Sequence, residues 1–261
     1  MPKVTVGVSL KMYFGHRAAR EWAADVADLA ASAPAVADGR VELFLAPGYL
    51  QLLPTLDAVW GTRVLVGAQD ASEHDAGAFT GDVSPAELAE IGVALVEIGH
   101  AERRRLHGET DAVVARKTAA ALRNGLIPLI CVGEPDRVAA DDAVAFVTAQ
   151  VLSALADAPA GRVIVAYEPV WAIGAPEPAP AEHIRRVTSW LRELLAGFEN
   201  RAGSTVIYGG SAGPGLLTEL GDDVDGLFLG RFAHDPAALA EVLAEAAALA
   251  DRRVESTAGA S

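Results

Sequence analysis

Eight short apolar segments, rich in Val, Ile and Leu, recur along the 261 residues and alternate with longer alanine-rich amphipathic segments. Segments that are apolar on both faces are typical of parallel strands that alternate with covering helices. The alternation therefore predicts an α/β fold with strands over Val4–Ser9, Val41–Ala46, Val64–Ala68, Ala94–Ile98, Ile127–Val132, Val163–Ala166, Val206–Tyr208 and Gly226–Leu229.

Helical patterns fill the intervals between these strands. The clearest span His16–Ala31, Asp111–Asn124, Ala140–Leu155, Ala181–Phe198 and Pro236–Ala250, and weaker ones span Gln51–Val59, Ser84–Glu90 and Gly215–Leu220. Eight strands at this length favour a single closed (β/α)8 barrel over residues 1–251, with a doubly wound open sheet as the alternative. Residues 252–261 are small and polar, and we expect them to form a frayed tail.

Charge and cysteine content exclude several classes of protein. Lys and Arg number 21 against 35 Asp and Glu, and the net charge of −14 disfavours nucleic acid and acidic membranes as partners. Cys131 is the only cysteine, which rules out an internal disulfide and a Cys-based zinc cluster. No segment is apolar enough to span a membrane, and Met1–Leu10 lacks a cleavage signal. We expect a soluble cytoplasmic protein.

Chemistry in a (β/α)8 barrel takes place where strands end and the following loops begin. Those positions hold a carboxylate, an imidazole, a cation and two glycine-containing loops, which suit proton transfer on a small phosphorylated substrate. In chain order they are Ser9 and Lys11, His100 and Glu102, Cys131 and Glu134, Glu168, Tyr208–Ser211, and Gly230 with Arg231.

Each candidate has a chemical reason for its position and an ordinary alternative. Glu168 ends an apolar strand, and its expected desolvation raises a carboxyl pKa, although a neighbouring arginine would satisfy it equally well. His100 can polarise a carbonyl as a neutral imidazole, whereas most lone histidines are structural. Lys11 can contact an anionic substrate or be an exposed lysine. The glycine loops at Gly209 and Gly230 can cradle phosphate or form plain turns.

Taken together, these segments resemble triosephosphate isomerases over nearly the whole chain. The matching stretches are Ser9–Met12, Val66–Gln69, Gly77–Gly81, Glu97–His100, Glu102–Arg104, Gly108–Thr110, Pro128–Glu134, Ala166–Gly174 and Tyr208–Ser211. The resemblance implies a TIM barrel and an isomerase that moves a proton between neighbouring carbons of a sugar phosphate. In this family's mechanism Glu168 would be the carbon base and neutral His100 would polarise the carbonyl. Lys11, positioned by Glu102, would stabilise negative charge, and no metal or organic cofactor is implied.

The resemblance also implies a phosphate site, a lid and a partner. Backbone N–H groups of Gly174, Ser211, Gly230 and Arg231 would hold the phosphate. A lid would close over the substrate and exclude water, and it would comprise Pro169, Val170, Trp171, Ala172, Ile173, Ala175, Pro176 and Glu177. The Gly77–Gly81 loop resembles the family's interdigitating loop, which implies a homodimer and leaves a tetramer open.

Departures from the family pattern cluster at the expected site. Ser9 stands where these isomerases carry asparagine, and Ala101 replaces the serine after the histidine. The lid tip reads Ala-Pro-Glu-Pro over 175–178, and Pro176 has no N–H with which to bond Ser211. Arg231 replaces a glycine of the phosphate turn and brings a cation and a bulky stem toward the phosphate.

One further feature concerns how the lid is held, and another concerns which substrate the enzyme uses. A backbone bond from Ala179 to the Tyr208 hydroxyl stays available to latch the lid. Serine at position 9, the proline-containing lid and the Gly-Leu-Phe-Leu-Gly-Arg segment are similar to a branch of erythrulose-phosphate isomerases, which act on four-carbon ketose phosphates.

The substrate is left open between two sugar phosphates. The first expectation is interconversion of dihydroxyacetone phosphate and glyceraldehyde 3-phosphate, the family's commonest activity, and the alternative is isomerisation of L-erythrulose 1-phosphate. A non-catalytic phosphate-metabolite binder is a third reading, although it has little use for the carbon base Glu168. A Schiff-base aldolase that uses Lys11 is a fourth.

Overall fold

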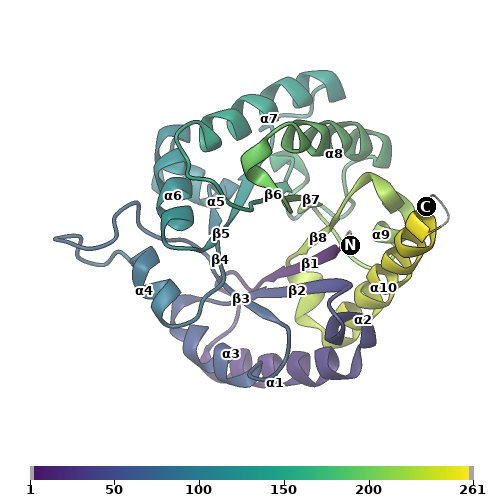
Figure 1. Ribbon diagram of the computed structural model, residues 1–261, viewed down its shortest axis with the longest axis horizontal. Helices are drawn as coiled ribbons and strands as arrows, with labels where there is room; N and C mark the ends of the chain where they lie inside the picture. Colours follow the sequence, from purple (N-terminus) through teal and green to yellow (C-terminus); the bar gives the residue numbers. More distant parts are fainter. Residues whose placement is uncertain (1–2, 259–261) are drawn as a thin grey trace.

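The computed structural model describes residues 3–258 and shows a closed barrel of eight parallel strands surrounded by helices (Figure 1). The strands pair in sequence order, and β1 closes the ring on β8. They are β1 Val4–Ser9, β2 Val41–Ala46, β3 Leu65–Ala68, β4 Leu95–Ile98, β5 Ile127–Val132, β6 Ile164–Tyr167, β7 Thr205–Tyr208 and β8 Gly226–Leu229. The expected TIM barrel is confirmed, and each predicted strand begins and ends within one residue of the observed one.

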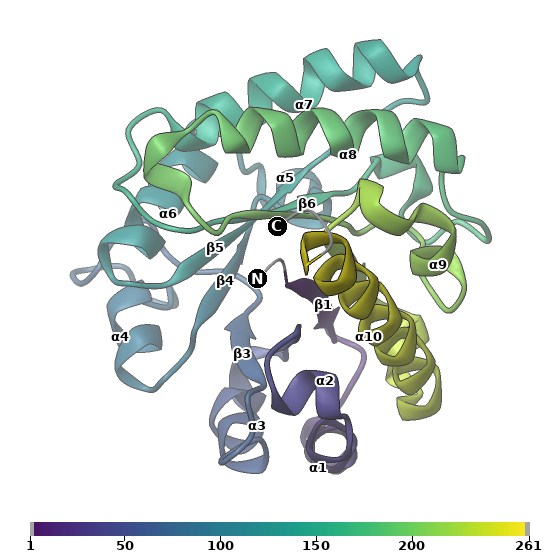
Figure 2. The ribbon, with the colours of Figure 1, turned by 45° about the vertical axis from the view of Figure 1, so that its right-hand side comes forward.

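Helices follow the strands on the outside of the barrel, and α7 and α8 lie side by side (Figure 2). The α-helices are α1 His16–Ser32, α2 Pro34–Ala37, α3 Leu52–Ala58, α4 Pro85–Glu90, α5 Ala101–His107, α6 Asp111–Arg123, α7 Ala140–Leu155, α8 Ala181–Ala196, α9 Leu216–Leu220 and α10 Pro236–Ala258. Short 3-10 helices are η1 Tyr49–Gln51, η2 Val170–Ala172, η3 Glu199–Arg201, η4 Gly221–Asp223 and η5 Arg231–His234. Helices α2 and α5 had not been predicted.

The inside of the barrel is filled by side chains and is not a channel. Phe44 and Phe228 lie there with ring centroids 5.6 Å apart, in one cluster with apolar residues of β4 to β7. Gly7 makes room for them, because a Cβ at this position would lie 2.0 Å from the Phe44 ring. This packed interior holds the carboxyl ends of the strands, where the site residues lie, in fixed positions.

The end of the chain differs from the expected frayed tail. Helix α10 continues through Ala258, so residues 252–258 are helical, and residues 259–261 lie outside the described part. Arg253 gives the physical reason. Its guanidinium is buried and donates to Asp222 Oδ1 at 2.9 Å and to the Val224 carbonyl at 2.7 Å, which fixes the last turns of α10 to the barrel.

Within residues 3–258 no helix is both long and apolar enough to cross a membrane. Over the same range no group of three or more His, Cys, Asp or Glu side chains is arranged to hold a metal ion.

Candidate active site

One cavity of about 660 Å³ opens at the carboxyl ends of the strands. It gathers all the catalytic, supporting and phosphate-binding candidates: Ser9, Lys11, His100, Glu102, Glu168, Gly174, Ser211, Gly230 and Arg231. Three expected lid residues, Ile173, Ala175 and Pro176, line it as well, and the other lid residues lie along the same segment outside the lining. Barrel closure thus brings together side chains that are far apart in sequence.

Glu168 directly follows β6 and is almost completely buried at 3% exposure. Among the residues that the structure describes, its Oε2 has no hydrogen-bond partner, and it lies 3.5 Å from His100 Nε2. Burial, followed by the nearby Glu97 carboxylate, raises the pKa of Glu168 well above its ordinary value, against the Lys11 charge. Gly209 permits this placement, since a Cβ there would meet Glu168 Oε1 at 2.6 Å. The carboxylate is therefore a strengthened base with a free oxygen.

His100 is the N-cap of α5, and this role decides which ring nitrogen carries the proton. Its Nδ1 accepts a hydrogen bond from the Glu102 backbone N–H at 3.1 Å, so the neutral ring carries its proton on Nε2. Burial and the Lys11 ammonium lower the pKa of His100 to about 4. A neutral imidazole that presents Nε2–H to the cavity can polarise a carbonyl.

Lys11 supplies the cation of the site from a strained turn after β1. Its φ of +47° is the only positive value at a non-glycine residue in the described chain. Gln69 supports this conformation, because its Nε2 donates to the Lys11 carbonyl at 3.0 Å and to the Ala46 carbonyl at 2.9 Å. The sequence had not identified Gln69 as a residue that positions Lys11.

The ammonium group of Lys11 is held by carboxylates. Lys11 Nζ donates to Glu102 Oε1 at 2.8 Å and lies 3.5 Å from His100 Nε2. Burial lowers the pKa of Lys11, but Glu102 and two further carboxylates outweigh it and raise the pKa above its ordinary value. A lysine held in this way stays protonated, which argues against a Schiff-base aldolase because that nucleophile must be a neutral amine.

Glu97, in β4, begins the Glu97–His100 motif, and the sequence alone assigns it no role at the site. It is buried beneath His100, and its Oε2 accepts a hydrogen bond from Ser9 Oγ at 3.2 Å. Burial raises the pKa of Glu97 to about 7, against the Lys11 charge. Because β1 and β4 are not neighbours in the ring, this bond crosses the barrel. Ser9 lines the cavity and Glu97 supports it from outside the lining, and we call this pair the floor of the cavity.

The lid begins at a polar anchor that includes Glu134. Trp171 Nε1 donates to Glu134 Oε1 at 2.9 Å, and the Tyr167 hydroxyl lies 3.1 Å from the same oxygen. The other end is held by the Ala179 N–H, which donates to the Tyr208 hydroxyl at 3.1 Å. The bond expected between Ala179 and Tyr208 is therefore present, and both ends of the lid are tied to the barrel.

At the mouth of the cavity, the groups expected to bind phosphate differ in whether they already have a hydrogen-bond or ion-pair partner. The Ser211 backbone N–H, expected to bind phosphate, donates to the Ala172 carbonyl at 3.2 Å. Gly230 and Arg231 stand at the start of η5. Arg231 is exposed and lines the cavity, and within residues 3–258 it makes no ion pair. Its charge is therefore available to an anionic group.

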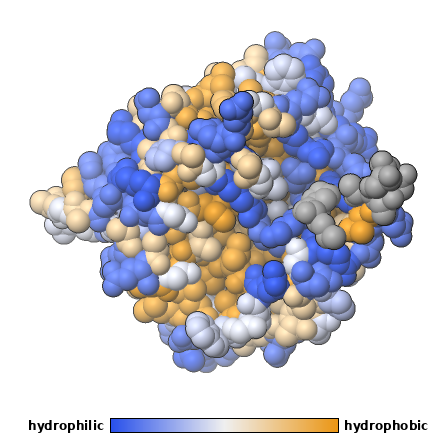
Figure 3. All heavy atoms as spheres, viewed as in Figure 1, coloured by the Kyte–Doolittle hydropathy of each residue, from blue (hydrophilic) through white to orange (hydrophobic). Residues whose placement is uncertain are grey.

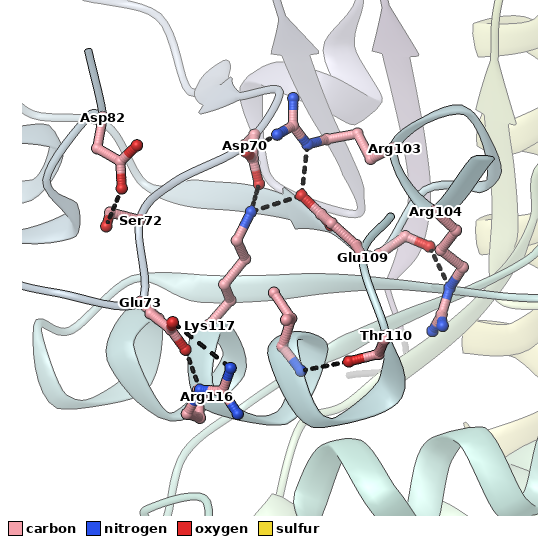
Figure 4. Close-up of polar contacts among 12 residues, drawn as sticks. Asp70, Ser72, Glu73, Asp82, Arg103, Arg104, Glu109, Thr110, Arg116 and Lys117 are labelled. Atoms are coloured by element: carbon pink, nitrogen blue, oxygen red, sulfur yellow. Dashed lines mark hydrogen bonds and ion pairs between the residues drawn. The ribbon is translucent and has the colours of Figure 1, made fainter. Parts of the chain in front are cut away.

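A buried ion-pair network supports the helices behind the site (Figure 4). Lys117 Nζ donates to Asp70 Oδ1 and to Glu109 Oε1, both at 2.6 Å. Arg103 binds the same two carboxylates, with 2.7 Å to Glu109 Oε1 and to Asp70 Oδ2. The network ties the segment after β3 to α5 and α6, and α5 is the helix that His100 caps.

Comparison with known proteins shows which family the chain belongs to. The family described as triosephosphate isomerase matches residues 4–246. The chain belongs to the triosephosphate isomerase family. This confirms the resemblance seen in the sequence, and it makes the chain a sugar-phosphate isomerase.

Individual relatives in the triosephosphate isomerase family differ in the substrates their names give. The chain is 48% identical to the L-erythrulose-1-phosphate isomerase of Pectobacterium atrosepticum over 254 residues, which cover 96% of this chain and 98% of the relative. It is 45% identical to the triosephosphate isomerase of Mycobacteroides abscessus over 194 residues, or 71% and 74% of the two chains. The crystal structure of triosephosphate isomerase from Bartonella henselae is similar with a TM-score of 0.77, 27% identity and coverage of 93% and 98%.

The tautomer of His100 in this isomerase gives a testable prediction. With a pKa of about 4, the ring stays neutral above about pH 5, with the proton on Nε2. Nitrogen-15 NMR of labelled histidine should show one protonated and one unprotonated ring nitrogen at neutral pH. A His100 ring that becomes cationic near pH 7 would contradict the assignment.

Proposed function

We propose that this isomerase acts on L-erythrulose 1-phosphate, a four-carbon ketose phosphate. The observation that carries the proposal is its similarity, over nearly the full length of both chains, to an isomerase named for that substrate. We therefore prefer this substrate, which was the alternative in the sequence analysis, to triose phosphate, which was the first expectation. Ser9, which departs from the usual triosephosphate isomerase asparagine, lines the cavity and supports the same choice.

Proton transfer proceeds between C3 and C2 of the substrate. Glu168 removes the proton from C3, and the Nε2–H of His100 polarises the carbonyl at C2 while Lys11 stabilises the negative charge. An enediolate forms across C2 and C3, and His100 moves protons between its two oxygens. Glu168 returns the proton to C2, so the carbonyl ends on C3 and the phosphate ester stays intact.

Phosphate binding takes place at the mouth of the cavity. Gly174, Ser211, Gly230 and Arg231 surround the phosphate, and the Arg231 guanidinium adds a charged donor to the backbone N–H groups. Ser211 must exchange its bond to the Ala172 carbonyl for the phosphate, which couples substrate binding to a lid residue. Lid closure then excludes water from the enediolate.

A kinetic comparison of two substrates tests the proposed function. Purified enzyme is assayed with L-erythrulose 1-phosphate and with dihydroxyacetone phosphate, each coupled to an enzyme that consumes its product. We expect a higher kcat/KM for the four-carbon substrate. A higher kcat/KM for dihydroxyacetone phosphate would restore triose phosphate as the substrate, and binding of both without turnover would favour a metabolite-binding protein.

The base assignment predicts the effect of Glu168→Gln. The variant keeps the shape of the side chain but cannot accept a proton, so kcat should fall by about 10²–10⁴-fold while KM changes little. The measurement is steady-state kinetics with the preferred substrate. Glu199→Gln, an exposed glutamate in η3, is the matched control and should keep the wild-type kcat. A Glu168→Gln enzyme with near-normal kcat would exclude Glu168 as the base.

We also propose that the enzyme is a homodimer that joins through the loop between β3 and α4. This loop projects from the barrel (Figure 1), and its surface is less hydrophilic than the blue regions around it (Figure 3). Ser72 Oγ donates to Asp82 Oδ2 at 2.7 Å and closes the base of the loop, while Phe79 near the tip is 41% exposed. Met12, at 97% exposure, offers a second apolar contact near the site.

The dimer proposal predicts the effect of charge at the loop tip. Phe79→Asp places a carboxylate in the expected interface and should shift the enzyme from dimer to monomer in analytical ultracentrifugation. Trp190→Asp, an exposed aromatic residue on α8 away from the loop, should leave the dimer intact. A wild-type monomer, or a dimer that Phe79→Asp does not weaken, would argue against this interface.

A further inference from the structure

Ser9 contributes a small side chain to the floor of the cavity. It is the last residue of β1, is 3% exposed, and lines the cavity. Triosephosphate isomerases carry asparagine at this position, and asparagine has two more side-chain heavy atoms than serine. The hydroxymethyl group that distinguishes a four-carbon ketose phosphate from dihydroxyacetone phosphate also adds two heavy atoms. The serine therefore frees about as much space as the larger substrate requires.

The direction of the substrate places this extra group at the floor. The phosphate candidates lie at the mouth, where Arg231 is exposed, and the reacting carbons lie between Glu168 and His100. C4 is attached to C3 on the side away from the phosphate. An extended substrate that places its phosphate at the mouth and C3 at Glu168 directs C4 toward Ser9 and Glu97.

The floor also offers a hydrogen bond to the C4 hydroxyl. A serine hydroxyl has one donor and two acceptor lone pairs, and Ser9 Oγ uses its donor on Glu97 Oε2 at 3.2 Å. Its lone pairs are left to accept from a second hydroxyl. Glu97 is buried, and its other oxygen, Oε1, lies 4.0 Å from His100 Nε2, so the carboxylate is held between His100 and the Ser9 hydroxyl that it orients.

We propose that Ser9 is the residue that sets substrate length, and that Ser9 with Glu97 forms the subsite for the C4 hydroxymethyl group. The C4 hydroxyl donates to Ser9 Oγ, which donates in turn to Glu97. This inference rests on the proposed function, because it assigns a place to the carbon that the triose substrate lacks.

Two substitutions at position 9 separate space from hydrogen bonding. Ser9→Asn fills the subsite while an amide N–H can still donate to Glu97, and Ser9→Ala keeps the space but removes the hydroxyl. For each variant kcat/KM is measured with L-erythrulose 1-phosphate and with dihydroxyacetone phosphate. Since one methylene in a fitted pocket changes kcat/KM by about 10–200-fold, Ser9→Asn should lower the four-carbon to three-carbon ratio by at least about tenfold.

Ser9→Ala should lower the same ratio less than Ser9→Asn does, through a higher KM for the four-carbon substrate. Arg231→Gly is the control at the mouth and should lower kcat/KM for both substrates by a similar factor, because both carry the phosphate. Activity of Ser9→Asn with dihydroxyacetone phosphate shows that this variant is folded. If Ser9→Asn does not fold, the substrate ratio of Ser9→Ala tests the C4 subsite instead.

The outcomes distinguish this inference from the proposed function. An unchanged ratio in Ser9→Asn, or in Ser9→Ala if Ser9→Asn does not fold, overturns the C4 subsite while wild-type turnover of the four-carbon substrate still supports the function. A wild-type enzyme that does not turn over L-erythrulose 1-phosphate overturns the proposed function and the subsite together. A ratio that falls in Ser9→Asn but not in Arg231→Gly supports the subsite.

Discussion

Closure of eight parallel strands into one ring is the main constraint on the geometry of the site. Parallel strands all end at the same rim, so loops that are far apart in sequence share one cavity. The interior below the rim must be filled, and Phe44 and Phe228 fill it because Gly7 carries no side chain. The resulting rigid base lets β1 and β4, which do not pair, hold Ser9 and Glu97 in contact across the barrel.

Charge balance is the second constraint, since several carboxylates face one ammonium group. Burial raises the pKa of Glu97 and of Glu168, the Glu97 carboxylate raises the pKa of Glu168 further, and Lys11 lowers both. Lys11 can do this only from the strained turn after β1, which Gln69 stabilises through two backbone carbonyls. The site therefore combines a base with a raised pKa, Glu168, with a histidine that resists protonation. The Lys11 cation contributes to the lowered pKa of His100 and opposes the raised pKa of Glu168.

The sequence predicted the barrel well because strand periodicity and strand ends are local properties. It predicted less where tertiary contacts decide. Helix α5 is short and polar, and it depends on His100 as its cap and on Arg103 in a buried ion-pair network, neither of which shows as periodicity. The last turns of α10 likewise depend on one long-range anchor, Arg253.

Within the site, sequence motifs located the side chains but not their partners. Family resemblance brought out Lys11, His100 and Glu168, and the structure brings all three into one cavity. The contact of Ser9 with Glu97 spans 88 positions along the chain, so no local pattern reveals it. The hydrogen bond from the Ser211 N–H to the Ala172 carbonyl likewise joins two loops and could not be predicted from the sequence.

The mouth of the cavity shows how one departure from the family pattern compensates another. Pro176 removes a backbone donor from the lid tip, so the tip cannot be held through its own N–H. The bond from Ala179 to Tyr208 ties down the end of the lid but not its tip. Under the proposed function, Arg231 supplies a charge-assisted contact to the phosphate, and such contacts are roughly twice as strong as neutral ones. On the same proposal, the phosphate that the lid segment encloses takes over part of the role that hydrogen bonds from the lid tip to the barrel would have.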